Sequence, residues 1–441
     1  MNLLFKKLTG QLHSTDRVER YIMAEEERIV RYRQVEKSPE LKEYFELKKV
    51  VESREFQQKK YNWVHTKYKS TQTYATIHEY KELLHDKKLQ MFLEMENSQR
   101  LKDFLEFRQS ENYIKLQSAK EVRYSLELKQ MAAFEKSKEY KSYLAYRDSK
   151  LPARFKALVA EIATDEFKKE HAFWTNPKRW RTTEEYQQEA RFKRLSAMED
   201  IIFFLRQDKN EIERKEEWKL VFEDEFQWLK MSDSKWRAGF AYDNPKLLRH
   251  HSYAQEQQAY NAGKNTGTVD NQLHVFVKKE KATSPAWDSK KGFVNKEFDY
   301  TSDFIQTADN FRLQGGQFVA KIRVEGRVHH AFWLGNGTKM PMISLFHYNG
   351  KHITVGNYTE KGFDGTVIRG INPKQYYLYS LSWTDKELIW YVNNVEVYRT
   401  NHDIPKEKLF MAVTSFIDEA QRAMEGQISV AWLRVFEHQG K

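Results

Sequence analysis

Residues 40–151 contain neither glycine nor proline, and this feature most limits what the chain can fold into. Both residue types interrupt helices, whereas the segment is rich in Lys, Glu, Leu, Gln and Ala, which favour them. So long a stretch without breaks predicts a region that is almost entirely α-helical. The full chain has 441 residues, more than one hydrophobic core usually supports, so we expect at least one further domain.

A short phrase recurs in this region: a hydroxyl residue, a carboxylate two residues later, and then a large apolar residue. Clear copies begin at Ser38, Ser53, Ser125, Ser137, Thr164 and Thr183, and looser copies begin at Ser98 and Ser110. Such a hydroxyl caps a helix by accepting a hydrogen bond from a free backbone N–H, and the acid favours the positive end of the helix dipole. Each copy therefore predicts the start of a short helix.

The repeat can be built in two ways. Consecutive short helices can stack into a rod or solenoid, which we favour because a helix of about ten residues buries little by itself. Alternatively, one longer helix carries the hydroxyls on its surface. In either case residues 1–217 are expected to form an all-α helical repeat or coiled-coil-like arm, suited to self-assembly or to binding a protein partner.

The pattern changes at about residue 217, where short alternating runs separated by glycine and asparagine turns replace the helical pattern. This spacing predicts an antiparallel β-sandwich over residues 218–441. Strands are expected at residues 219–222, 273–278, 316–324, 331–334, 343–348, 353–355, 376–383, 388–391, 395–398 and 428–436. The expected fold class is thus multidomain α and β.

Five segments of the second half occur in an order typical of one family. They are Trp218–Phe226 followed by Trp236, Leu313–Arg323, His330–Leu334, Ser380–Asn394 and Trp432–Phe436. In order and spacing they resemble glycoside hydrolase family 16 over roughly half of the chain. The resemblance implies a jelly-roll sandwich of the concanavalin A-like kind, whose concave face cleaves or binds β-glucans and related polysaccharides.

The family's catalytic strand reads Glu-x-Asp-x-x-Glu, and here the chain departs from it. The resemblance places Met342 at the nucleophile, Ser344 at the assisting aspartate and His347 at the acid/base. A retaining glycosidase needs two carboxylates about 5 to 5.5 Å apart. Methionine cannot attack the sugar, and no Asp or Glu lies between Glu325 and Glu360. We therefore expect no catalytic residues and no standard hydrolysis.

The remaining groove can still bind a sugar through flat apolar rings and hydrogen-bonding side chains. The candidates are His330, Trp333, Phe346, His347, Tyr348, Asn357 and Tyr358. The same residues also fit an ordinary sandwich core and rim, and the sequence leaves both interpretations open.

No cofactor and no metal are expected. The chain has no cysteine, and Ala431 stands where the family often has an aspartate that serves a structural calcium. His329 and His330 make a poor metal site because neighbours on a strand point to opposite faces. One of them is expected at the concave face and the other beneath it.

The net charge of +11 is spread over both halves of the chain. The one local basic cluster, residues 178–194, is better explained as a solvated helical face, so nucleic-acid binding is not expected. No segment is long and apolar enough for a signal peptide or a membrane span, which predicts a cytoplasmic protein. The sequence thus favours a non-catalytic structural or recognition protein. The alternative is a carbohydrate-active protein, either a lectin-like β-glucan binder or a glycosidase of altered mechanism that uses His347.

Overall fold

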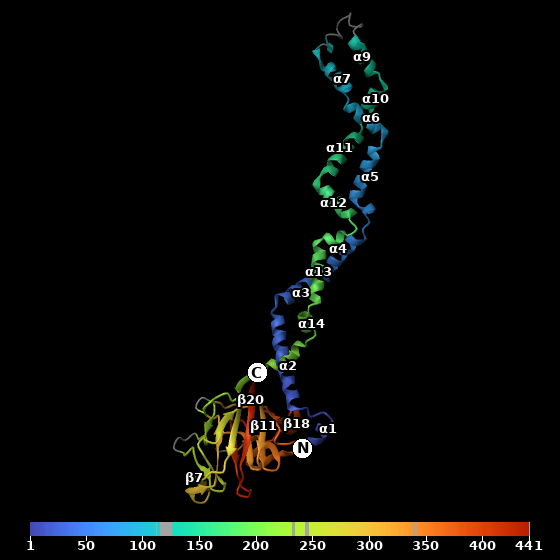
Figure 1. Ribbon diagram of the computed structural model, residues 1–441. Helices are drawn as coiled ribbons and strands as arrows, with labels where there is room; N and C mark the ends of the chain where they lie inside the picture. The colour runs from blue at the N-terminus through green and yellow to red at the C-terminus, as the bar shows by residue number, and fades with distance from the viewer. Residues whose placement is uncertain are drawn as a thin grey trace. The chain divides into compact units, whose positions relative to one another are not determined.

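The computed structural model forms two compact units (Figure 1). It describes residues 1–111, 113–114, 126–231, 234–242, 247–337, 340 and 342–440. The first unit combines Met1–Arg33 with Gln207–Lys441, and the second comprises Gln34–Arg206. The helix start predicted at Ser125 and position 341 of the motif strand lie outside the described residues.

The second unit is built from short helices. Their bounds are α3 Pro39–Val51, α4 Arg54–His65, η1 Tyr68–Ser70, α5 Gln72–Leu84, α6 Lys87–Glu96, α7 Gln99–Gln109, α9 Leu126–Glu135, α10 Lys138–Arg147, α11 Lys150–Ala163, α12 Asp165–Thr175, η3 Arg179–Thr182, α13 Glu184–Ser196 and α14 Glu199–Leu205. The helix α2 (Thr15–Glu36) leads into this unit from the first one. The prediction of consecutive short helices is confirmed.

The recurring phrase does cap these helices. Its hydroxyl accepts a hydrogen bond from the backbone N–H of the large apolar residue, as in Ser38 to Leu41, Ser53 to Phe56, Ser98 to Leu101, Ser137 to Tyr140, Thr164 to Phe167 and Thr183 to Tyr186. In several copies the hydroxyl also donates to the carbonyl three residues before it, for example Ser38 to Val35. One side chain therefore links the end of one helix to the start of the next.

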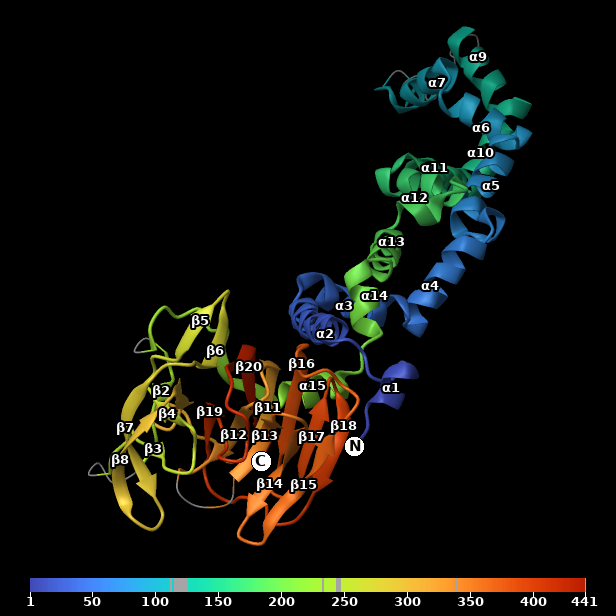
Figure 2. The same cartoon turned by 60° about the horizontal axis from the view of Figure 1, so that its bottom comes forward.

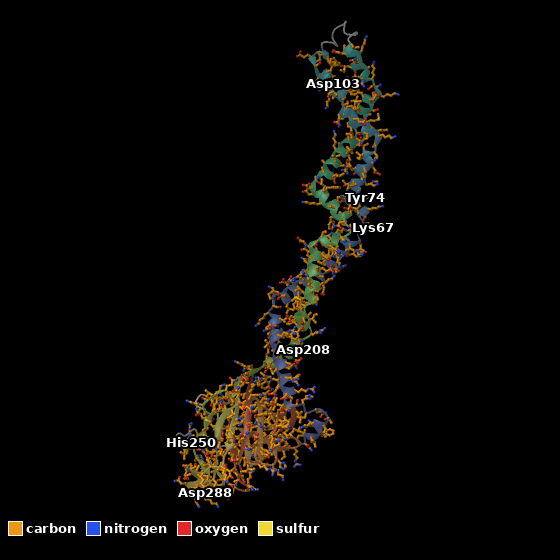
Figure 3. All side chains as sticks on the ribbon, viewed as in Figure 1. Lys67, Tyr74, Asp103, Asp208, His250 and Asp288 are labelled. Carbon is orange, nitrogen blue, oxygen red and sulfur yellow. The ribbon has the colours of Figure 1, made fainter. Side chains whose placement is uncertain are left out.

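Aromatic rings from the two halves of the unit face one another in pairs. The pairs are Tyr44 with Phe192, Phe56 with Trp180, Tyr68 with His171, Tyr80 with Phe155, Phe92 with Tyr143, and Phe104 with Phe134. The ring centroids are between 5.1 and 6.0 Å apart. The partner's residue number falls as the first number rises, so the unit is a hairpin of two antiparallel limbs joined by an aromatic ladder. Tyr74, labelled in Figure 3, packs edge-on against Tyr68 beside one rung.

The ladder corrects the predicted solenoid. Neighbouring helices along the chain are not the main packing partners, because each helix packs on one from the opposite limb, such as α3 on α13 and α6 on α10. A ten-residue helix does need a neighbour for stability, but the neighbour comes from far along the sequence. The basic segment 178–194 also contributes to this packing, since Arg179 donates to the carbonyls of Trp63 and Thr66 and Arg191 pairs with Glu43.

Removing one ring from the ladder should destabilise the helical unit. Phe92 is 4% exposed, so Phe92→Ala should cost about 3 kcal/mol or more through lost burial and the cavity it leaves. Val159 on α11 is 42% exposed, and Val159→Ala is the control that should change stability by less than about 0.5 kcal/mol. Denaturant unfolding followed by circular dichroism at 222 nm measures both. Equal losses in the two variants would contradict the ladder.

The first unit is an antiparallel β-sandwich, as predicted. In the described residues, one sheet runs in the order β18-β17-β16-β11-β20-β6-β5 with β1 also paired to β20, and the other runs β15-β14-β13-β12-β19-β10-β2. Smaller sheets β3-β7-β8 and β4-β9 lie beside them. The bounds are β1 Trp218–Asp224, β2 Arg237–Ala238, β3 Ser252–Tyr253, β4 Gln258–Tyr260, β5 Thr266–Val269, β6 Gln272–Val277, β7 Ala282–Asp288, β8 Gly292–Phe298, β9 Tyr300–Ser302, β10 Phe304–Gln306, β11 Gly316–Glu325, β12 His329–Gly335, β13 Met342–Asn349, β14 Ile353–Thr359, β15 Gly362–Ile368, β16 Tyr377–Trp383, β17 Leu388–Val392, β18 Val395–Thr400, β19 Phe410–Phe416 and β20 Gly426–His438.

The two large sheets bury one hydrophobic core between them. On β11, alternate residues such as Phe318, Ala320 and Ile322 point into it and are fully buried. The other sheet contributes Phe332 from β12 and Leu345 from β13. All the expected strands are present. The central strand β19 was not predicted, because its six consecutive buried residues do not alternate, and neither were β2–β5, β7–β10 and β15.

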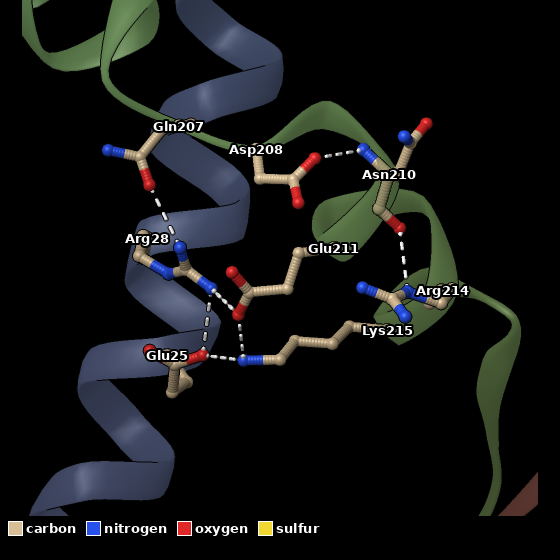
Figure 4. Close-up of polar contacts among 8 residues, drawn as sticks. All are labelled: Glu25, Arg28, Gln207, Asp208, Asn210, Glu211, Arg214 and Lys215. Atoms are coloured by element: carbon tan, nitrogen blue, oxygen red, sulfur yellow. Dashed lines mark hydrogen bonds and ion pairs between the residues drawn. The ribbon is translucent and has the colours of Figure 1, made fainter.

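The first unit also includes the helices that flank the helical unit in the chain. These are α1 (Leu4–Leu8), the first part of α2, and α15 (Lys209–Glu216). On α2, the Arg28 guanidinium donates to Gln207 and Glu211 at 2.9 and 2.8 Å, and Lys215 pairs with Glu25 (Figure 4). Helix turns to strand at residues 217 and 218, as predicted. The compact unit, however, also takes in residues 1–33 and 207–217, because these ion pairs tie them together.

The start of α2 is in turn attached to the sandwich. The Glu19 carboxylate accepts from the Trp432 indole N–H at 2.8 Å and from Lys321 at 2.9 Å, and so joins α2 to β20 and β11. Among the described helices, none is long and apolar enough to cross a lipid bilayer.

Candidate functional site

A cavity of about 380 Å³ lies on the outer face of the seven-stranded sheet, away from the sandwich core. Its floor is formed by side chains of β12, β13, β14 and β19, and loops beyond β2 and β3 supply further residues. The lining comprises Phe240, Tyr253, Glu256, Tyr260, Phe304, Ala331, Trp333, Gly337, Met342, Ser344, His347, Tyr358, Thr414 and Phe416.

The three positions that the family resemblance aligned with its catalytic residues meet in this cavity. Met342 and Ser344 are two residues apart and share a face by ordinary strand alternation, but His347 is three residues further on. A β-bulge restores its direction: Phe332 pairs with Phe346 and Trp333 pairs with Ser344, which leaves Leu345 as an extra residue. Both Leu345 and Phe346 then point into the core, and His347 returns to the cavity face.

The bulge is held from the opposite sheet. The Trp390 indole of β17 donates to the Ser344 carbonyl at 2.9 Å, across the core. The Ser344 hydroxyl is buried in the cavity lining and has no hydrogen-bond partner among the described residues. A buried hydroxyl without a partner costs free energy, so this atom is suited to bind a polar ligand group.

His329 and His330 point to opposite faces of β12, as expected. However, His330 was the candidate for sugar contact, and it is His329 that lies on the cavity side. His330 is 0% exposed and bonds the Ser415 hydroxyl at 2.8 Å and the Glu325 carbonyl at 3.0 Å, so it lies beneath the sheet face. His329 is the one on the cavity side, with its Nδ1 2.9 Å from Nε2 of His347. Burial and, to a smaller extent, the neighbouring His329 together lower the pKa of His347 to about 4. The His347 imidazole is therefore neutral at pH 7.

Three of the seven candidate sugar-binding residues line the cavity: Trp333, His347 and Tyr358. The other four do not, because each is buried elsewhere. His330 has the contacts just described, Phe346 packs on Tyr379 in the core, Tyr348 donates to the Gly350 carbonyl, and Asn357 donates to the Asp403 carbonyl. The candidates included neighbours in sequence such as Phe346 and His347, which strand alternation places on opposite faces, so only part of the set could reach one cavity.

The cavity contains a carboxyl group that sequence analysis missed. Glu256 follows β3 in the chain and reaches the lining from the side, far in sequence from the motif strand. Its Oε2 accepts a hydrogen bond from the Gln258 side chain at 2.6 Å. Burial, assisted by the nearby Asp418 carboxylate, raises the pKa of Glu256 to about 8 even though hydrogen bonds from Gln258 and Tyr260 lower it. Glu256 thus holds a proton at neutral pH.

The cavity is therefore almost free of charge at pH 7. Glu256 is the one carboxyl among the described lining residues, and the described lining includes no Lys or Arg. In the described part of the chain, no group of three or more His, Asp or Glu side chains is arranged to hold a metal ion. The arrangement offers aromatic faces together with neutral hydrogen-bonding groups.

Because the pKa of Glu256 is raised in the folded chain, the unfolding free energy should depend on pH. Between pH 4.5 and about 8 the folded chain keeps a proton that the unfolded chain releases, so this group's contribution falls as pH rises. Glu256→Gln keeps the shape and removes the titration. As pH rises over this range, the unfolding free energy of the unchanged protein should therefore fall relative to that of the Glu256→Gln variant, by up to about 1.4 kcal/mol per pH unit. Chemical denaturation at pH 5, 6.5 and 8 measures the difference, and a difference that is constant with pH would refute the assignment.

Comparison with known proteins gives structural neighbours only. Similar solved structures include the catalytic domain of a laminarinase from Thermotoga petrophila, with 16% identity, 51% of this chain and 99% of that chain covered, and a TM-score of 0.41. An endo-β-1,3-glucanase from Pyrococcus furiosus has 16% identity, coverage of 50% and 94%, and a TM-score of 0.40. A mutant of a non-specific endo-β-1,3(4)-glucanase of family GH16 has 18% identity, coverage of 50% and 95%, and a TM-score of 0.41. The sequence matches no family model and no curated protein.

Proposed function

We propose that the sandwich unit is a carbohydrate-recognition module that binds a glycan without cleaving it. The observation that carries this proposal is the cavity itself, which is lined by the rings of Trp333, Tyr358 and Phe416 and by Ser344, whose hydroxyl has no partner among the described residues. Sugar rings have apolar faces that pack on aromatic side chains and hydroxyl groups that need hydrogen-bond partners. A neutral cavity of about 380 Å³ suits an uncharged sugar of one or two rings.

The chemistry of the lining supports binding over hydrolysis. Retaining hydrolysis needs a carboxylate nucleophile as well as an acid, and the described lining has Glu256 alone. Met342 stands where the resemblance places the nucleophile, and a thioether carries no charge to attack an anomeric carbon. With a pKa of about 4, the His347 imidazole is neutral at pH 7 and lacks the acidic imidazolium proton that a general acid donates.

A hydrolase of altered mechanism is the second candidate, and Glu256 is the observation that favours it. A carboxyl that keeps its proton at pH 7 can act as a general acid, and the neutral imidazole of His347 can act as a general base for water. Release of reducing ends from laminarin or lichenan separates the two candidates. Release that disappears in Glu256→Gln would establish the hydrolase, whereas no release alongside saturable binding would support the recognition module.

Binding should stabilise the unit measurably. A glycan present at one hundred times its Kd adds about 2.7 kcal/mol to the unfolding free energy, which a thermal-shift titration with soluble laminarin or lichenan detects. Trp333→Ala should abolish the shift because it removes the largest ring of the cavity floor. Trp174→Ala, in the helical unit, is the matched control and should keep it. A shift that survives in Trp333→Ala would place the binding site elsewhere.

We also propose that the helical unit serves assembly. A cavity of about 600 Å³ between α6 and α10 is lined by Met91, Phe92, Met95, Tyr143 and Tyr146, among others. Met91 is 53% exposed at the cavity, and Leu105 and Leu84 on neighbouring helices are 40% and 39% exposed, so apolar surface is available to a second copy or another protein. The charged side chains Lys88, Arg100, Glu94 and Glu139 at the same cavity can orient such a contact.

Self-assembly through this cavity can be measured directly. Light scattering during size exclusion should give a mass above that of one chain at tens of micromolar, and Met91→Glu should return it to that of one chain. The substitution replaces an apolar side chain of the contact with a carboxylate that must lose its hydration there, which is unfavourable. A mass of one chain at every concentration would leave only a different protein as the partner.

A further inference from the structure

A second cavity lies beside the first one in the sandwich unit. It has a volume of about 230 Å³ and is lined mainly by aromatic side chains, namely Tyr242, His251, Tyr253, Trp287 and Phe293, together with two leucines. Tyr253 lines both cavities. We propose that the two form one extended site and that the ligand is an oligosaccharide whose successive rings occupy both. This inference rests on the proposed carbohydrate-recognition function.

The position of the second cavity continues the direction of the first. The first crosses β13, β12 and β19 toward β10, and β2 is the next and last strand of that sheet. The second is lined by Tyr242, Leu247 and Leu248, which follow β2 in the chain, and by the small sheet β3-β7-β8, where Tyr253 of β3 pairs with Trp287 of β7. Figure 2 shows β7 and β8 as a hairpin at the side of the sandwich, and Figure 3 labels Asp288 at its turn. A chain lying across the sheet would therefore reach this hairpin.

Rings connect the two cavities without interruption. Phe240 of the first cavity stacks on His251 of the second, with centroids 4.5 Å apart, and lies 5.4 Å from the ring of Tyr253. His251 contacts Phe293 edge-on at 5.2 Å, and Phe293 contacts Trp287 at 5.1 Å. The wall between the cavities is thus made of the same kind of surface as the cavities themselves.

The far end of this series is exposed. Trp287 is 41% and Phe293 50% exposed, although both belong to a hairpin whose turn carries Lys290 and Lys291. Large rings on a charged hairpin expose apolar area to water unless something covers them. A pyranose ring packs its C–H face on such a surface while its hydroxyls stay in water, which fits a site that is apolar on one side and open on the other.

The combined volume of the two cavities also supports one extended site. The first cavity is near the lower end of the range of about 300–1,000 Å³ that is usual for small-molecule sites. With the second cavity added, the site is near the middle of that range, and its lining runs from β13 to the β7-β8 hairpin. Such a site discriminates by the length of the sugar chain.

The test is isothermal titration of the full-length chain with β-1,3-linked gluco-oligosaccharides of two, four and six residues. In the unchanged protein, affinity should rise with length. Trp287→Ala should lower the affinity for the six-residue ligand by about tenfold and reduce the ratio of long to short affinities. Trp287→Phe should retain most of that ratio, since it keeps a ring, and Lys290→Ala at the hairpin turn is the control that should match the unchanged protein.

The outcomes separate this inference from the function on which it rests. Affinity that is independent of length, or a Trp287→Ala variant with an unchanged ratio, would overturn the extended site and leave recognition in the first cavity intact. An equal loss for every length would also overturn it, because the second cavity would then only support the first. Failure of the unchanged protein to bind any of the three ligands would overturn both.

Discussion

The extra residue in β13 is the constraint on which the candidate site depends. Because Leu345 and Phe346 both enter the core, Ser344 and His347 emerge on the same face of the sheet. The bulge is fixed by the Trp390 indole, which reaches across from the other sheet to the Ser344 carbonyl. The packing of the core therefore decides what the cavity presents, and the two cannot be changed independently.

The same burial that shapes the cavity removes its charge. It raises the pKa of Glu256 and lowers that of His347, so that at neutral pH both groups are uncharged hydrogen-bonding partners. A retaining glycosidase, in contrast, needs at least one carboxylate that stays ionised beside the sugar. A neutral, aromatic-lined cavity instead suits an uncharged sugar, which is why we propose recognition and not catalysis.

Sequence reasoning succeeded where the signal was local. The helix starts at Ser38 and Ser98 follow from a hydroxyl and its own next few residues, and the strands follow from alternation. It failed where two contacting residues are far apart in the sequence. Tyr44 stacks on Phe192, which is almost 150 positions later in the chain, and no residue near Tyr44 indicates that partner. Glu256 was missed for the same reason, since the search for a carboxylate covered the neighbourhood of β13, whereas the fold brings one from a loop after β3. His330 was chosen over His329 because alternation fixes the relative directions of two neighbours and leaves open which of them faces the groove.

The most direct test is a glycan array probed with the full-length chain, with release of reducing ends assayed on every glycan that binds. The account predicts specific, saturable binding to a small set of uncharged glycans and no release above background over a long incubation. Sustained cleavage of a bound glycan would contradict the central claim, because it would show that the chain hydrolyses what it binds. Binding to no glycan would contradict it as well, and would leave the sandwich as a scaffold for the helical unit.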